Sequence, residues 1–92
     1  MAYTLVYTDE VRKDTEELKK SGDKASLRKL AKMLEELTEH PYTGTGQPEQ
    51  LKYDFSGCWS RRINRKHRLV YQVEEQTVTV ILLSAYGHYD DR

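Results

Sequence analysis

The stretch WSRRINRKHRLVY, from Trp59 to Tyr71, combines the alternating pattern of β-strands with a high density of basic side chains. The basic residues in it are Arg61, Arg62, Arg65, Lys66, His67 and Arg68. The whole chain of 92 residues carries 15 Lys and Arg against 15 Asp and Glu, so its formal net charge is +0. The positive charge of this stretch is therefore a local feature, and a local basic field attracts anionic partners even when the total charge cancels.

The stretch predicts a β-hairpin with one of two registers. A two-residue turn at Arg65-Lys66 would mix apolar and charged side chains on both faces. A three-residue turn at positions 64–66 places Arg62 opposite Arg68 and leaves one face largely apolar. That face then holds Trp59, Ile63, Leu69, Tyr71 and Val73, with Arg61 and His67 as exceptions. Because burial of one face selects strand register strongly, we favour the three-residue turn.

This register has a consequence for Arg62 and Arg68. Like charges directly opposite each other in a sheet are destabilising, so the pair is costly unless an anion lies between the two side chains. Planar guanidinium groups suit bidentate contacts to phosphate. The cations of this stretch, Arg61 and Arg65 among them, are then candidate ligands of an anionic substrate. The alternative is a solvated polar face that carries arginines without a partner.

Outward from the hairpin, the pattern predicts an α+β domain over residues 1–92, with a mostly antiparallel sheet and two N-terminal helices packed on one face. We expect a first strand over Ala2–Thr8, a helix capped by Thr8 or Asp9 that runs to about Lys20, and a second helix near Ala25–Glu39 capped by Asp23 or Ser26. The segment His40–Gln50 is a loop rich in proline and glycine. Strands are expected at Leu51–Asp54, Cys58–Ile63, His67–Val73 and Thr77–Ala85.

Composition excludes several classes of protein. No stretch approaches the roughly 20 apolar residues that span a membrane, and the N-terminal sequence lacks the pattern of a signal peptide. Cys58 is the only cysteine, which excludes a disulfide framework and makes a cytoplasmic location the expectation. Cys58, His67 and His88 lack zinc-binding spacing, so we expect neither a metal nor another cofactor. Residues 52–72 carry six cations and one anion, a local net charge of +5.

Outside the hairpin, two short segments supply groups that could do chemistry. Glu49 and Lys52 lie in QPEQLK after the loop, and His88 and Tyr89 lie in SAYGHYDDR at the end of the last strand. A carboxylate as base, an imidazole as acid and arginines around a phosphate meet the needs of RNA cleavage by its own 2′-hydroxyl, without a metal. Alternatively, Glu49 and Lys52 form an ordinary exposed pair and the terminal histidine takes no part.

The run GTGQPEQLKYDFSGCWSRRINRKHRLVYQV, together with the ending GHY, resembles the Txe/YoeB toxins of bacterial type II toxin–antitoxin modules, within the RelE superfamily. The resemblance covers nearly the whole chain. It implies a microbial-RNase-like fold and a ribosome-dependent mRNA endoribonuclease that cleaves mRNA in the ribosomal A site. It also implies inhibition by a cognate acidic antitoxin, and it makes a homodimer plausible.

The same resemblance implies roles for individual residues. Glu49 corresponds to the general base, His88 to the general acid and Arg68 to the main stabiliser of the transition state. Arg62 and Lys52 would contact the scissile phosphate, and Tyr89 would position the substrate's bases or the terminal histidine. The rival hypothesis is a non-catalytic RNA-binding or ribosome-binding module. Only an enzyme requires Glu49 and His88 to converge on the face that holds Arg62 and Arg68.

Overall fold

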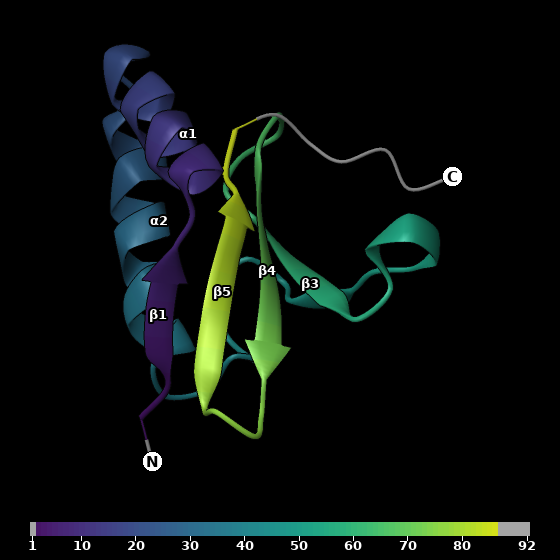
Figure 1. The fold of residues 1–92 in the computed structure, drawn as a ribbon. Coiled ribbons are helices and arrows are strands. Elements are labelled where there is room, and N and C mark those ends of the chain that lie inside the picture. The colour runs from purple at the N-terminus through teal and green to yellow at the C-terminus, as the bar shows by residue number, and fades with distance from the viewer. Residues whose placement is uncertain (1, 87–92) are drawn as a thin grey trace.

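A computed structural model describes residues 2–86, apart from the side chain of Asp54. Its elements are β1 (Thr4–Tyr7), α1 (Asp9–Lys20), α2 (Lys24–Leu37), β2 (Glu49–Gln50), the 3-10 turn η1 (Tyr53–Phe55), β3 (Cys58–Arg62), β4 (Arg68–Glu74) and β5 (Thr79–Ser84). The strands form one sheet in the order β1-β5-β4-β3-β2. β1 runs parallel to β5, and the other neighbours are antiparallel. Both helices lie on the same side of the sheet (Figure 1), so the predicted α+β class is confirmed.

Each helix begins at a side-chain cap, and the structure selects one of the two candidates for each. The Thr8 hydroxyl accepts a hydrogen bond from the amide of Val11 at 3.2 Å and donates one to the carbonyl of Leu82 at 2.6 Å. Asp23 caps α2 by accepting from the amide of Ser26 at 3.0 Å. Such caps satisfy amide groups that have no partner within a helix. The Thr8 contact also fixes the start of α1 to the end of β5.

The core lies between the helices and the sheet. From α1 and α2 it takes apolar residues at helical spacing, and from β3, β4 and β5 the side chains that face the helices. Its buried members are Val11, Leu18, Leu30, Met33, Leu37, Ile63, Leu69, Tyr71, Val80, Leu82 and Ala85. The apolar stripe predicted for the second helix therefore packs on the sheet. The opposite face of the sheet is not covered by a helix within residues 2–86 (Figure 1).

The β3–β4 hairpin has the predicted three-residue turn. Arg62 pairs with Arg68, and the amide of Ile63 donates to the carbonyl of His67 at 2.9 Å. The Asn64 side-chain oxygen closes the turn by accepting from the amides of Lys66 and His67, both at 2.8 Å. Successive side chains of the hairpin point to opposite faces of the sheet, so Arg62 and Arg68 share one face and Arg61 lies on the other.

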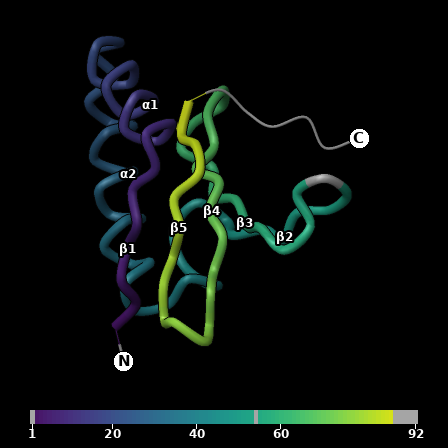
Figure 2. The backbone as a smooth tube through the Cα atoms, in the orientation of Figure 1, coloured from purple at the N-terminus to yellow at the C-terminus, as the bar shows by residue number. Residues whose placement is uncertain are grey.

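The prediction of a strand at Leu51–Asp54 is wrong. Pairing with β3 begins earlier, at Glu49–Gln50, and the chain leaves the sheet after Leu51, whose amide still donates to the carbonyl of Cys58 at 2.9 Å. Tyr53 then takes a φ of +57° and opens the 3-10 turn, which is incompatible with a continuing strand. In Figure 2 the segment around β2 and η1 extends away from the helices, on the far side of the sheet.

The last strand is shorter than expected. Its predicted start at Thr77 falls within the turn that joins β4 to β5, and Val78 there has a φ of +49°. Within residues 2–86, no helix has the length and apolar character to cross a membrane.

Candidate functional site

Three neighbouring strands bring Glu49 and Arg68 together on the open face of the sheet. Glu49 pairs with Ser60 across β2 and β3, and Arg68 enters from β4. One Arg68 nitrogen, Nη1, lies 3.3 Å from Glu49 Oε1 and donates to the Ser60 hydroxyl at 3.1 Å. The Glu49 side chain is 58% exposed, so its carboxylate is accessible to a ligand. The two residues to which the resemblance assigns base and transition-state roles are therefore in contact.

Ser60 is a site residue that the sequence analysis missed. Its side chain is fully buried, and its hydroxyl accepts a hydrogen bond from the guanidinium of Arg68. The available signal was its small size at an open-face position of β3, between bulky neighbours. Small polar residues at such positions leave room for a long side chain from the adjacent strand to cross over them.

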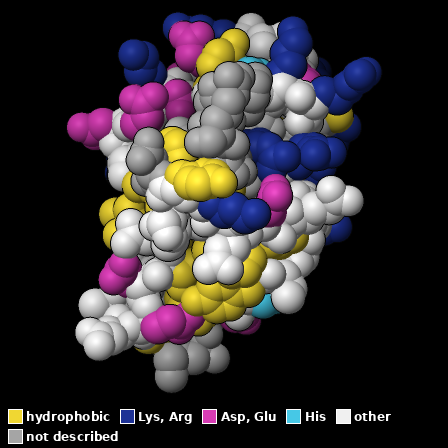
Figure 3. Space-filling view, turned by 90° about the vertical axis from the view of Figure 1, so that its right-hand side faces the viewer, with side chains coloured by type: hydrophobic (Ala, Val, Ile, Leu, Met, Phe, Trp, Pro, Cys, Tyr) yellow, Lys and Arg dark blue, Asp and Glu magenta, His cyan; other side chains and the backbone are white. Residues whose placement is uncertain are grey.

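Beside this contact, four cations surround a hollow of about 330 Å³. The hollow is lined by Arg62, Asn64, Arg65, Lys66 and Arg68. Arg62, Arg65 and Lys66 are exposed and form no ion pair with any described residue. Figure 3 looks onto this side of the molecule and shows Lys and Arg side chains gathered on its upper right part. The arrangement suits an anion with several oxygen atoms, such as a phosphate.

Lys52 is exposed at the start of η1, just after β2, and it contributes no ion pair to this cluster among the described residues. His88 and Tyr89 lie outside the described residues. No group of three or more His, Cys, Asp or Glu side chains that could hold a metal ion occurs within residues 2–86.

Arg61 requires a correction, because its side chain is fully buried and cannot meet a substrate. Its Nη1 lies 2.7 Å from Glu36 Oε1, and its Nη2 donates to the carbonyls of His40 and Thr43 at 2.9 and 2.8 Å. Its Nε donates to the Tyr71 hydroxyl at 3.1 Å. Arg61 lies on the helix-facing side of β3, so these protein groups satisfy it. The expectation that it binds substrate is therefore wrong.

The partners of Arg61 anchor the loop that leads to Glu49. Burial on its own raises the pKa of Glu36, but hydrogen bonds from Thr45 and Arg61 outweigh it and lower that pKa below its usual value. Glycine is required where the loop approaches α2. A Cβ at Gly46, whose φ is +90°, would lie 2.8 Å from Met33 Sδ. The carbonyl of Gly46 in turn accepts from the amide of Arg62 at 2.7 Å, which joins the loop to β3.

Glu36 was also missed, although a signal was present. It lies between Met33 and Leu37 in the apolar stripe of α2, and Arg61 is the exception on the apolar face of the hairpin. Two opposite charges on faces that must meet in a core predict an ion pair.

Comparison with known proteins identifies the family. Residues 7–89 match the family model of the YoeB-like toxin of the bacterial type II toxin–antitoxin system. The chain belongs to this family. The resemblance inferred from the motif is thereby confirmed.

Individual members of the YoeB-like family align over most of their length. The chain is 40% identical to the toxin YoeB of Synechocystis sp. over 68 residues, which cover 74% of this chain and 77% of that one. It is 39% identical to the toxin RelK of Mycobacterium tuberculosis over 69 residues, which cover 75% and 79% of the two chains.

Solved structures share the fold. A YoeB/ParE toxin from Agrobacterium tumefaciens superposes with a TM-score of 0.84 at 32% identity, over 94% of this chain and 99% of that one. The toxin in a heterotetrameric YoeB–YefM complex from Staphylococcus aureus gives a TM-score of 0.77 at 29% identity, over 97% and 100%. A YoeB dimer from the same organism gives 0.79 at 29%, over the same shares of the two chains.

Proposed function

We propose that this toxin is a ribosome-dependent mRNA endoribonuclease that cleaves through attack by the RNA 2′-hydroxyl. The observation that carries the proposal is the contact between Glu49 and Arg68 beside the exposed Arg62. A proton acceptor beside two guanidinium groups supports cleavage at a phosphate that these groups would hold. The family membership supports the same reaction, and the proposal needs no metal or other cofactor.

In this mechanism Glu49 takes the proton of the 2′-hydroxyl as that oxygen attacks the adjacent phosphorus. Arg68 and Arg62 stabilise the negative charge that gathers on the phosphate oxygens, and Lys52 and Arg65 assist in binding. The Glu49–Arg68 ion pair is partly exposed, and exposed ion pairs contribute little to stability. Phosphate oxygens can therefore replace the carboxylate at the Arg68 fork at small cost.

The resemblance assigns the remaining step to His88, which would protonate the departing 5′-oxygen, and gives Tyr89 a positioning role. An imidazole is suited to this step because its ordinary pKa, about 6.5, lets it carry and release a proton near neutral pH. The products are then a 2′,3′-cyclic phosphate and a free 5′-hydroxyl.

We also propose the cellular setting. Residues 1–92 act as one domain in the cytoplasm, with mRNA in the ribosomal A site as substrate. The YoeB–YefM complex from Staphylococcus aureus suggests that an antitoxin binds this toxin, and the YoeB dimer suggests a homodimer. We propose that the antitoxin is acidic and covers the basic face.

The proposal is tested by mapping mRNA cuts by primer extension in a purified translation system, with and without ribosomes. Wild-type protein should cut only translated mRNA, and Arg68→Ala should lose cleavage while it keeps the fold. Arg28→Ala, an exposed change on α2, is the matched control and should cut normally. Binding to ribosomes without any cuts would instead identify the non-catalytic module, and wild-type cutting by Arg68→Ala would refute the assigned site.

A further inference from the structure

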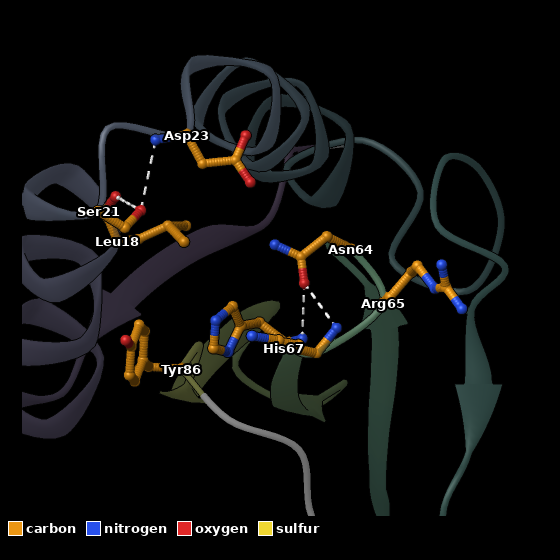
Figure 4. A pocket seen from close by; sticks show the side chains of 8 residues that line it. Leu18, Ser21, Asp23, Asn64, Arg65, His67 and Tyr86 are labelled. Carbon is orange, nitrogen blue, oxygen red and sulfur yellow. Dashed lines mark hydrogen bonds between the residues drawn. The ribbon is translucent and has the colours of Figure 1, made fainter.

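A second and larger hollow, of about 500 Å³, lies next to the hollow that Arg62 and Arg68 line. It is lined by the end of α1, the start of α2, the β3–β4 turn and Tyr86, the second residue after β5 (Figure 4). Its lining includes Asp23, Asn64, Arg65, Lys66, His67 and Tyr86. Neither the general base nor the arginine pair of β3 and β4 belongs to this lining, so the hollow needs an explanation of its own.

One wall of the hollow is an aromatic stack. The rings of His67 and Tyr86 are nearly parallel, with centroids 4.2 Å apart and an interplanar angle of 20°. Figure 4 shows the two rings side by side at the base of the hollow. Tyr86 is 44% exposed, so its ring offers surface to a ligand. Nucleobases stack on aromatic side chains of this kind, with little dependence on which base is present.

The positive and negative charges of the hollow lie on different elements. Arg65 and Lys66 are exposed on the turn, and the carboxylate of Asp23 faces the interior from the start of α2 (Figure 4). Hydrogen bonds from the Ser26 hydroxyl and amide lower the pKa of Asp23, so this group stays ionised at neutral pH. A phosphate is attracted to the turn and repelled by the carboxylate. A nucleotide would therefore place its phosphate at Arg65 and Lys66 and its base near Asp23.

The carboxylate also discriminates between bases. It has about four acceptor positions. Ser26 occupies two of them, with contacts of 3.0 and 2.6 Å, and the Asn64 side chain makes a further hydrogen bond to the carboxylate. The acceptor capacity that is left can accept from the exocyclic amino group of adenine, cytosine or guanine. Uracil has no amino group, and its one donor on that edge, N3–H, lies between two carbonyl oxygens that the carboxylate repels.

The two hollows border the same turn, because Asn64, Arg65 and Lys66 line both. Asn64 is fixed there by its donation to the Ser26 hydroxyl at 2.9 Å, so the turn is held against α2. An RNA strand with one phosphate between Arg62 and Arg68 would therefore meet the second hollow beside the same turn.

We propose that this hollow is a subsite for the mRNA nucleotide next to the scissile phosphate, with its base stacked on Tyr86 and an amino-bearing base preferred over uracil by Asp23. The inference rests on the proposed endoribonuclease function and adds a base preference to it.

The first experiment measures binding without cleavage. Short 2′-O-methyl RNA oligonucleotides lack the attacking hydroxyl, so the full-length wild-type toxin can be titrated with them. We vary the base at each position in turn. At one position A, C and G should bind several-fold tighter than U. Tyr86→Leu should weaken binding roughly tenfold, whereas Lys20→Gln, an exposed change outside the hollow, should not. Equal affinities for all four bases at every position would overturn the proposal.

The second experiment uses Asp23→Asn, which retains a good N-cap for α2 and adds a donor in place of a charge. The preference against U should shrink or reverse, while thermal stability changes little. An unchanged base preference would contradict the role of Asp23.

Single-turnover cleavage on ribosomes separates the possible failures. If wild-type toxin cuts no mRNA, the endoribonuclease proposal itself fails. If it cuts and the base beside the cut changes the rate for wild type but less for Tyr86→Leu, the subsite belongs to mRNA as proposed. An equal loss in Tyr86→Leu for every mRNA base would place ribosomal RNA in the hollow and overturn the assignment.

Discussion

Arg61 and Arg62 are neighbours in the chain, yet β-strand geometry gives them different environments. Arg61 is buried among Glu36, Tyr71 and the carbonyls of the preceding loop, while Arg62 is exposed opposite Arg68. Removing the first would leave the carboxylate of Glu36 without its partner inside the protein. Removing the second would relieve repulsion between like charges.

This contrast gives a paired prediction. Arg61→Ala should destabilise the fold by about 3–5 kcal/mol, the usual cost of breaking a buried ion pair. Arg62→Ala should leave the free energy of unfolding within about 0.5 kcal/mol or raise it slightly, while lowering cleavage. Urea denaturation and single-turnover cleavage measure the two effects. A large loss of stability in Arg62→Ala would show that its position opposite Arg68 is structural.

At the same scale, the proposed acid and base can be tested individually. Glu49→Gln and His88→Gln each keep a side chain of similar size and remove the ability to exchange a proton at that point. Each should lower the chemical step on the order of 10²–10⁴-fold, with ribosome affinity nearly unchanged. Rapid-mixing single-turnover assays report the chemical step. A variant that cleaves as fast as wild type would lose its assigned role.

Among the elements, the β3–β4 turn connects the two hollows through Asn64. Its oxygen accepts from the amides of Lys66 and His67, and its nitrogen donates to Ser26. Asn64→Ala should cost about 1–3 kcal/mol because these partners lose a bond. Asn64→Asp preserves the acceptor and should cost less. Thermal melts of the two variants provide the comparison, and equal losses would mean that closure of the turn by the side-chain oxygen is unimportant.

The ion pair between Glu36 and Arg61 predicts how the stability of the fold depends on pH. The folded state lowers the pKa of Glu36, so this carboxylate stabilises the fold above its ordinary pKa, about 4.3, and the contribution is lost as pH falls through the lower folded value. Glu36→Gln should therefore be less stable than wild type at pH 7, and the difference should shrink under acidic conditions. Glu35→Gln, exposed on the same helix, is the control. Stability measured from pH 7 to pH 3 tests this.

The elements also show why the sequence predicted some parts of the fold and missed others. The hairpin register followed from burial of one face, and the helix caps followed from local chemistry. The segment after Glu49 and the start of the last strand did not, because Tyr53 and Val78, respectively, adopt positive φ values that neither residue favours. The contact of Glu49 with Arg68 depends on three strands, so the motif could name these residues without placing them. Arg61 was misassigned because its partner Glu36 is distant in the chain.

For the whole molecule, a net charge of +0 coexists with one basic face. Binding to RNA should then depend on a few phosphate contacts at that face rather than on the total charge. We expect affinity for ribosomes to fall with added salt, and Arg62→Gln to reduce the slope of log affinity against log salt by about 1. Titrations at several salt concentrations test this, with Lys20→Gln as the control. An equal change of slope in both variants would point to a diffuse electrostatic attraction.

The pairing of β1 with β5 also has a consequence for biosynthesis. Thr4 is in register with Thr79, so β1 is synthesised well before its partner strand β5. Val80 and Leu82, on that late strand, complete the core beneath the helices. A chain made from its N-terminus therefore cannot close this sheet until β5 has been synthesised. A truncated translation product would lack the strand that joins β1 to β4, and so would be inactive as a toxin.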